Sequence, residues 1–163
     1  PLDEETEGIW SDYIVETLNE AGFHRYEVSN YALGDHESLH NKVYWHYENY
    51  YGVGIGATAK IDDELISHTR SLTDYLQGKN TIYIEKETIE DTMFNHLMMS
   101  LRLEEGLDLD EFKRRYHRTI EEVYQEALSK NLDNHNLIIE NNHLKTNHTL
   151  DLLNSILLDF LPE

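Results

Sequence analysis

Residues 88–103 read TIEDTMFNHLMMSLRL, and this stretch decides the fold of the C-terminal half of the chain. An apolar residue recurs there at every fourth position: Ile89, Met93, Leu97 and Leu101. Such spacing places the apolar side chains on one face of a helix. Thr88 and Asp91 have the spacing of a capping pair. The stretch therefore predicts a long helix, beginning at about residue 85 and buried on one side.

Two further capping pairs follow this helix. Asp108 and Glu111 predict the start of one short helix, and Thr119 and Glu122 predict the start of another. Both predicted helices carry apolar residues at helical spacing. We therefore expect three consecutive helices in this part of the chain.

The pair Asn141-Asn142 is typical of a tight hairpin turn between two short strands. The expected strands are residues 137–140 and 143–146, and a last helix is expected over residues 150–161. Three helices, a hairpin and a final helix predict a helical, winged-helix-like C-terminal domain over residues 79–163.

The N-terminal half is expected to begin with an amphipathic helix that has an acidic, solvated face. Its apolar residues recur at helical spacing: Trp10, Tyr13, Ile14, Leu18 and Ala21. Gly22 follows as a C-terminal stop. Alternation predicts a strand over residues 26–32, and a glycine-studded strand is expected over residues 50–61 after a loop at 33–49. A helix followed by a strand indicates an α/β unit.

The remainder of the N-terminal half is predicted as a turn, a strand and a short helix. Asp62-Asp63 is the expected turn, with a return strand over residues 65–69 and a helix over residues 71–76 that Gly78 closes. The composition changes after this glycine. We therefore expect a first domain over residues 1–78 and a mixed α+β or α/β architecture for the whole chain.

The charge of the chain restricts its partners. The 163 residues include 32 acidic and only 13 basic side chains, and the formal net charge is −19. Such a field repels phosphate backbones and anionic lipid headgroups, so nucleic acid is an unfavourable partner. The sequence has neither an apolar run long enough for a membrane span nor a secretion signal, which predicts a cytoplasmic protein.

The chain contains no Cys. A disulfide scaffold, a thiol nucleophile, a zinc-thiolate site and an iron–sulfur cluster all require cysteine sulfur, so none of them can be built from these residues. The chain begins at Pro1 rather than Met and continues directly into a helical pattern. We therefore expect it to be a piece of a larger protein.

Three alternating glycines form the most unusual motif. Gly52, Gly54 and Gly56 would share one face of a strand, because side chains alternate along a strand with period two. A face without side chains suits a bulge or a closely packed helix, and equally the approach of a flat ligand to the backbone. The spacing does not match a dinucleotide fingerprint or a P-loop.

His36, His40 and His46 are candidate metal ligands, although their spacing matches no recognised metal motif. A single axial bond to haem iron needs only one histidine beside an apolar slot. The aromatic residues that could form such a slot are Tyr44, Trp45, Tyr47, Tyr50 and Tyr51. The alternative is that His40 and Asn41 bond the loop backbone.

Three segments together resemble a known family: YEVSNYA at residues 26–32, HNKVYW at 40–45 and YGVGIGA at 51–57. They are similar to the haem chaperones of the HemW type, also called oxygen-independent coproporphyrinogen III oxidase-like proteins of the radical S-adenosylmethionine superfamily. The resemblance extends from about residue 10 to residue 161. Its most specific element is HNxxYW, which distinguishes the chaperone-like members from true coproporphyrinogen dehydrogenases.

The resemblance implies a two-part architecture. Residues 1–78 would be the last β/α elements of a partial TIM-like radical SAM barrel with its extension, and residues 79–163 would be the family's C-terminal helical domain. In the family, a CxxxCxxC loop of the N-terminal part holds a [4Fe-4S] cluster beside S-adenosylmethionine. This chain lacks that loop, and we expect it to be catalytically inactive alone.

The resemblance also implies a site and a function. HNxxYW is associated with haem, which makes His40, Asn41, Tyr44 and Trp45 candidate haem-binding residues, with His40 as the iron ligand. By the same resemblance, the glycines at 52, 54 and 56 would lie near the cofactor end of the barrel. The implied function is to bind haem and deliver it to acceptor haem proteins.

Two other functions stay open. One is an oxidoreductase of porphyrin biosynthesis, an oxygen-independent coproporphyrinogen III oxidase (coproporphyrinogen dehydrogenase), which HNxxYW disfavours. The other is an interaction module without chemistry of its own, in which the C-terminal domain docks a basic partner.

Overall fold

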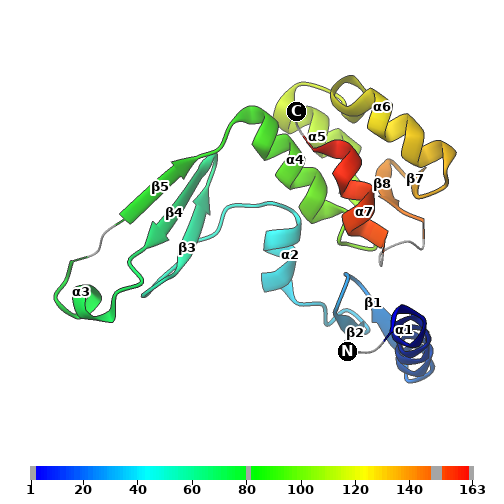
Figure 1. Ribbon diagram of the computed structural model, residues 1–163, viewed down its shortest axis with the longest axis horizontal. Coiled ribbons are helices and arrows are strands. Elements are labelled where there is room, and N and C mark those ends of the chain that lie inside the picture. Colours follow the sequence, from blue (N-terminus) through cyan, green and yellow to red (C-terminus); the bar gives the residue numbers. More distant parts are fainter. Residues whose placement is uncertain (1–2, 80–81, 148–151, 162–163) are drawn as a thin grey trace.

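The computed structural model describes residues 3–79, 82–147 and 152–161 and shows a mixed α+β fold. In Figure 1 most of the helices gather in one body near the C-terminus, and a three-stranded sheet extends from this body as an arm. Helix α2 (Leu39–Trp45) lies between the arm and the body. Every strand pair that the structure describes is antiparallel.

The helical body contains the three consecutive helices that the sequence predicts. They are α4 (Ile89–Ser100), α5 (Leu109–Tyr116) and α6 (Ile120–Asp133). Thr88 with Asp91 and Thr119 with Glu122 form complete capping boxes, and the carboxylate of Asp108 accepts two backbone N–H bonds at the start of α5. These capping pairs fix where the helices begin, because they satisfy backbone donors that have no partner within the helix.

The core of the helical body is apolar and continuous. The predicted stripe of α4 supplies Met93, Leu97 and Leu101, which are almost completely buried, whereas Ile89 at its start is 53% exposed. The other buried members of this cluster lie C-terminal to α4: Leu107, Phe112, Tyr116, Ile120, Leu128, Leu137, Leu144, Leu153, Ile156, Leu157 and Phe160. Since each helix contributes an apolar face to one cluster, burial of apolar surface holds the body together.

A small sheet and a last helix close the body. Strands β7 (Leu137–Glu140) and β8 (His143–Thr146) pair across Asn141-Asn142, and the short strand β6 (Leu107–Asp108) pairs with β8. Both asparagines have positive φ, so the predicted tight hairpin turn is confirmed. The last helix is α7 (Leu153–Leu157), continued by the 3-10 turn η2 (Leu158–Phe160). The predicted start of this helix at residue 150 lies outside the described residues.

The N-terminal segment forms a helix and a small hairpin. Helix α1 (Glu4–Glu20) and the positive φ of Gly22 after it agree with the prediction. The single strand predicted over residues 26–32 is wrong. The chain instead forms β1 (Phe23–Arg25) and β2 (Tyr31–Leu33), which pair with each other. The backbone turns between them because the Tyr26 N–H donates to the Asn30 carbonyl, and Arg25 donates to the carbonyls of Glu27 and Val28.

The predicted loop and glycine strand also differ from the structure. Helix α2 lies inside the expected loop at 33–49, and β3 (Thr58–Ile61) occupies only the end of the expected strand at 50–61. Gly54 and Gly56 have positive φ, which breaks the period of two. The three glycines therefore do not share one face of a strand.

The arm consists of strands β3, β4 (Glu64–His68) and β5 (Ile82–Lys86), in that order. The turn at Asp62-Asp63, the return strand β4 and the short helix α3 (Leu72–Leu76) with Gly78 after it agree with the prediction. The sequence does not predict strand β5. This strand contains residues 85 and 86, where the sequence predicts the start of the long helix. Three apolar residues of β5 are exposed: Ile82, Tyr83 and Ile84. Because β5 has no buried face, its sequence shows no alternation of apolar and polar residues from which a strand could be predicted.

Strand β5 follows the expected domain boundary at residue 78 and pairs with β4 before it. The boundary itself, the partial barrel and the winged-helix description stay predictions. Across the ranges described above, no helix has the length and apolarity that a membrane span requires.

Gly52 is needed for a close approach of two backbone segments. A Cβ atom at this position would lie 2.3 Å from the Thr58 carbonyl oxygen. We expect Gly52→Ala to lower the free energy of unfolding by about 1–3 kcal/mol, because the backbone must move to relieve the overlap. Chemical denaturation measures the change. Gly8→Ala is the control, since a Cβ there meets no atom within 4 Å. Equal stability of the two variants would contradict the packing role of Gly52.

Candidate functional site

Helix α2 carries the four residues of the HNxxYW motif. Ser38 caps this helix by accepting a hydrogen bond from the Asn41 N–H. His40 and Tyr44 are one turn apart, and the Tyr44 hydroxyl lies 3.2 Å from His40 Nε2, with the two rings in edge contact at 4.9 Å. His40 is exposed. The helix therefore presents an imidazole that a neighbouring phenol orients and that solvent can reach.

Trp45 points away from this pair and toward the helical body. Its carbonyl accepts a hydrogen bond from Ser100 of α4, and its ring lies 5.6 Å from the Arg102 guanidinium carbon. The indole Nε1 is buried and has no hydrogen-bond partner. The structure thus brings His40 and Tyr44 together and uses Trp45 to attach the helix to the body.

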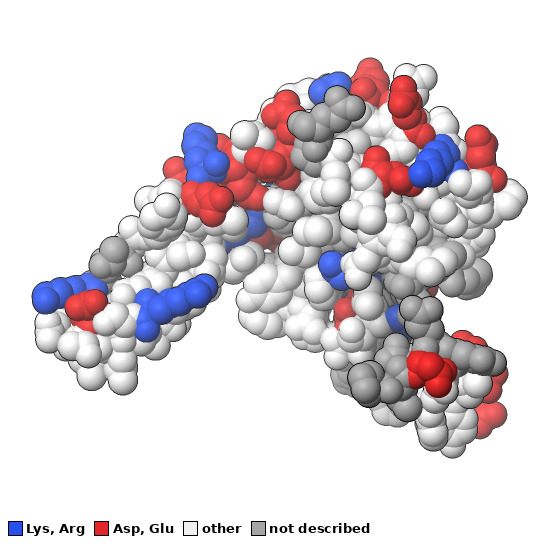
Figure 2. Space-filling model, in the orientation of Figure 1, with Lys and Arg blue, Asp and Glu red and all other residues white. Residues whose placement is uncertain are grey.

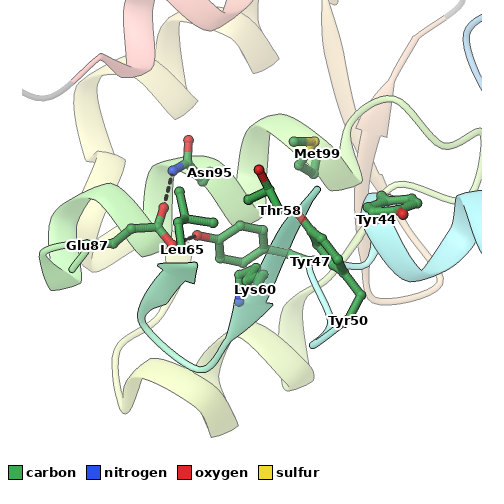
Figure 3. Close-up of a pocket in the computed structure, with 9 residues that line it drawn as sticks. All are labelled: Tyr44, Tyr47, Tyr50, Thr58, Lys60, Leu65, Glu87, Asn95 and Met99. Atoms are coloured by element: carbon green, nitrogen blue, oxygen red, sulfur yellow. Dashed lines mark hydrogen bonds between the residues drawn. The ribbon is translucent and has the colours of Figure 1, made fainter. Parts of the chain in front are cut away.

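A cavity of about 250 Å³ lies beside α2, between the arm and α4. Tyr44 and Tyr50 both line it, and their ring centroids are 4.5 Å apart. Figure 3 shows side chains from α2, the arm and α4 converging on this space. The residues that line it are Tyr44, Tyr47, Tyr50, Thr58, Lys60, Leu65, Glu87, Asn95 and Met99. The candidate site is therefore an exposed histidine next to an aromatic cavity.

Tyr47 is the most constrained residue of the cavity. It is 5% exposed, has a φ of 54° and donates a hydrogen bond of 2.6 Å to Glu87. Glu87 also accepts a bond of 2.6 Å from the Asn95 amide (Figure 3). Arg115 donates to the Tyr47 carbonyl, and the Lys60 ammonium lies 4.0 Å from the centre of the Tyr47 ring. Burial and the Glu87 hydrogen bond raise the pKa of Tyr47, so it remains a neutral donor.

His96 of α4 lies beneath Tyr47. Its ring stacks on those of Tyr47 and Phe112 at 6.0 Å, and the side chain is almost completely buried. Burial lowers the pKa of His96 to about 3, so the imidazole is neutral. Its Nδ1 is buried without a partner. His96 therefore has a packing role between α2 and the body.

A chain of ion pairs fixes the outer side of α2. Lys42 pairs with Glu37 at 2.8 Å and with Glu105 at 3.3 Å, and Glu105 pairs with His46 at 3.1 Å. The hydrogen bond from His46 holds the pKa of Glu105 at about 2, and the same bond raises the pKa of His46. His24 of β1 pairs with Glu37 at 3.0 Å. These contacts connect α2 to the N-terminal hairpin and to the turn after α4.

The other sequence candidates have different positions. Gly52 serves the close approach to Thr58, and nothing lies within 4 Å of a Cβ placed on Gly54. The three glycines do not form the strand face without side chains that suggested a flat ligand. Contact of Gly52, Gly54 and Gly56 with a cofactor stays a prediction. His36, His40 and His46 form no cluster: none of the described residues fall into groups of three or more His, Asp or Glu side chains that could hold a metal ion.

Several residues of the cavity were not apparent from the sequence. Glu87, Asn95 and Met99 belong to the linker before α4 and to α4 itself, and they reach the cavity only because the chain folds back. Lys60 is visible in the sequence as one of few cations near the candidate motif. The pattern of apolar and polar residues near the end of the expected strand does not indicate that the Lys60 side chain is buried, with only 1% exposed.

Positive charge near the site is scarce. Figure 2 shows Lys and Arg in small groups among more abundant acidic side chains on the visible face. Lys42 is engaged by Glu37 and Glu105, and Lys60 donates to the Asp62 carbonyl at 2.9 Å. An anionic group bound here would therefore find few available cationic partners.

The fold defines the class of the C-terminal body. The domain family described as HemN C-terminal domain matches residues 88–148, which contain α4, α5, α6 and the β7–β8 pair. The structure of coproporphyrinogen III oxidase (HemN) from Escherichia coli, a radical SAM enzyme, has a TM-score of 0.73 and covers 98% of this chain. The sequence identity is 13%, so this likeness shows the fold alone.

The particular relatives are proteins named heme chaperone HemW. The Haemophilus influenzae protein is 31% identical over 157 residues, 90% of this chain, and the Lactococcus lactis protein is 30% identical over 126 residues, 73% of this chain. The chain therefore belongs with the HemW-like and coproporphyrinogen III oxidase-like proteins, and the expected resemblance is confirmed. It spans 39% and 32% of the lengths of these two relatives, and 42% of the HemN chain.

The resemblance to radical SAM proteins that the sequence suggests implies S-adenosylmethionine and an iron–sulfur cluster. Cysteine thiolates hold such clusters, and this chain has no Cys. The residues of this chain therefore do not fit an iron–sulfur cluster, because they include no cysteine to hold it.

Tyr47→Phe tests the hydrogen bond that joins α2 to the linker before α4. The substitution leaves one oxygen of Glu87 without its donor, and we expect the free energy of unfolding to fall by about 1–3 kcal/mol. Urea denaturation measures the loss. Tyr51→Phe is the matched control, because Tyr51 is 86% exposed. An equal effect of the two substitutions would show that the Glu87 bond contributes nothing.

The His46–Glu105 pair predicts a dependence of stability on pH. The pKa of His46 is raised in the folded state, so its contribution is complete below the ordinary value of 6.5 and is lost as the pH rises through the raised pKa. The pKa of Glu105 is lowered to about 2, so its contribution is present above the ordinary value of 4.5 and is lost as the pH falls toward 2. Both contributions are complete between these two ordinary values.

Thermal unfolding from about pH 6 to about pH 8 measures the His46 part. We expect His46→Gln to remove about 0.2–1 kcal/mol of pH-dependent stability, the usual range for a partly exposed pair. His36→Gln is the control, since His36 is exposed and takes part in none of the ion pairs found among the described residues. A pH profile of His46→Gln that coincides with that of the unmodified protein would refute the assignment.

Proposed function

We propose that this chain is the haem-binding part of a HemW-type haem chaperone, in which haem is a cargo bound for delivery to acceptor haem proteins. The observation that carries the proposal is the exposed His40–Tyr44 pair beside an aromatic cavity, on the helix that contains HNxxYW. The names of the relatives support it, since the Haemophilus influenzae and Lactococcus lactis proteins are called heme chaperones.

His40 is the proposed iron ligand. A neutral imidazole binds haem iron through a ring nitrogen, and a hydrogen bond to the other nitrogen fixes the tautomer. The Tyr44 hydroxyl lies 3.2 Å from His40 Nε2 and orients the imidazole that is the proposed ligand. Asn41 and Trp45 complete the proposed haem-binding set, Asn41 in the first turn of α2 and Trp45 by anchoring its end.

The whole protein would supply what this chain lacks. S-adenosylmethionine and a [4Fe-4S] cluster belong to the proposed full-length form, with Gly52, Gly54 and Gly56 near that cofactor. The residues of this chain that bind and orient haem belong to the proposed partial barrel of residues 1–78. The alternative assignment, a coproporphyrinogen dehydrogenase, has the HemN fold in its favour but no residue of this chain that marks its reaction.

Haem titration followed at the Soret band tests the proposal. We expect His40→Ala to shift the band and to weaken binding about tenfold or more, equivalent to about 1.4 kcal/mol or more, because the iron loses its protein ligand. His36→Ala is the matched control, as this exposed histidine lies on the same segment without contacting Tyr44. An unchanged band and affinity for His40→Ala would exclude His40 as the ligand.

Product analysis separates the alternative. Anaerobic incubation of the full-length protein with coproporphyrinogen, a reductant and S-adenosylmethionine should yield no protoporphyrinogen if the protein is a chaperone. Formation of that product would favour the dehydrogenase.

A further inference from the structure

The cavity beside α2 is too small to enclose a whole porphyrin. Sites that enclose a drug-sized ligand measure about 300–1,000 Å³, and this cavity measures about 250 Å³. It is therefore suited to one edge of a larger planar molecule whose remainder lies outside.

The walls of the cavity favour an apolar edge. Tyr44 and Tyr50 present rings, Leu65 of β4 and Met99 of α4 present aliphatic and thioether groups, and Thr58 adds a methyl (Figure 3). The transfer of apolar groups from water to such a surface is favourable. Vinyl and methyl substituents of a porphyrin fit these walls, and propionates do not.

The charges of the cavity point in the same direction. The Glu87 carboxylate is held in the wall by Tyr47 and Asn95 at 2.6 Å each. A second carboxylate brought beside it would be repelled. The two nearby cations offer little compensation. Lys60 is 1% exposed and its ammonium contacts the Asp62 carbonyl and the Tyr47 ring, and the Arg115 guanidinium donates to the Tyr47 carbonyl.

His40 lies close enough to this cavity for one ligand to use both. Its ring contacts Tyr44 at 4.9 Å, and Tyr44, which lines the cavity, contacts Tyr50 at 4.5 Å. These spacings are short enough for a porphyrin held by its iron at His40 to reach across Tyr44 to the cavity.

We propose that the cavity receives the vinyl-bearing edge of the haem bound at His40, and that Glu87 excludes porphyrins with a carboxylate on that edge. This inference rests on the proposed function and adds its specificity. The two propionates of haem then point away from the cavity into solvent. An iron porphyrin that carries a propionate on every edge, such as iron coproporphyrin I with its alternating methyl and propionate groups, places a carboxylate against Glu87 in any orientation.

Filling the cavity tests the placement of the edge. We expect Leu65→Trp to weaken haem binding about tenfold, measured by Soret titration of the full chain. Leu72→Trp on α3 is the matched control and should leave the affinity unchanged, because Leu72 is 60% exposed and lies outside the cavity. Met99→Phe fills the same space from α4 and serves as a second variant if Leu65→Trp does not fold. Equal haem affinity in the filled variants and the control would overturn the inference.

Changing the charge tests the exclusion. The unmodified chain should bind haem at least about tenfold more tightly than iron coproporphyrin I, and Glu87→Gln should remove most of this preference. Glu90→Gln, an exposed position in the first turn of α4, should retain it. Equal affinity of the unmodified chain for both iron porphyrins would overturn the inference while leaving haem binding intact. If the unmodified chain bound no haem, the proposed function would fail and this inference with it.

Discussion

Tyr47 connects the parts of this molecule that are far apart in sequence. Its hydroxyl bonds Glu87 before α4, its carbonyl accepts from Arg115 of α5, and its ring lies between the Lys60 ammonium and the imidazole of His96. The left-handed backbone of such a bulky residue costs about 1–3 kcal/mol. The contacts of Tyr47 must outweigh this cost. They do so together, because they join Tyr47 both to the arm and to the helical body.

The position of α2 follows from this constraint. With Tyr47 fixed just after the helix and Trp45 attached to α4, His40 is left exposed while Tyr44 lines the cavity. The ion pairs of Lys42 and His46 with Glu105 hold the same helix from its other side. Since an axial ligand must keep its orientation to bind iron, the rigidity of α2 is a property of the proposed site as well as of the fold.

The sequence predicted elements whose signals are local and missed those that depend on distant contacts. Thr88, Asp108 and Thr119 cap helices with neighbours three residues away or fewer, so α4, α5 and α6 could be predicted from single segments. Glycine spacing did not reveal that Gly54 and Gly56 have positive φ. The cavity could not be predicted at all, because Leu65 and Met99 become neighbours only after the arm pairs and α4 packs. The HNxxYW residues were found by resemblance, and their helix was missed because Ser38 is followed at the capping position by Asn41 rather than Glu or Gln.

The scarcity of cations near the site bears on the proposed cargo role. A protein that retains haem permanently gains by pairing both propionates with Arg or Lys, since charge-assisted bonds are strong and slow to break. Here Lys42 is already paired with two carboxylates, and Lys60 is buried against Asp62 and Tyr47. The proposed attachments are then one axial bond and one apolar edge. Differences in affinity between related complexes arise mainly in the dissociation rate, so a site without propionate clamps favours the release that delivery to an acceptor requires.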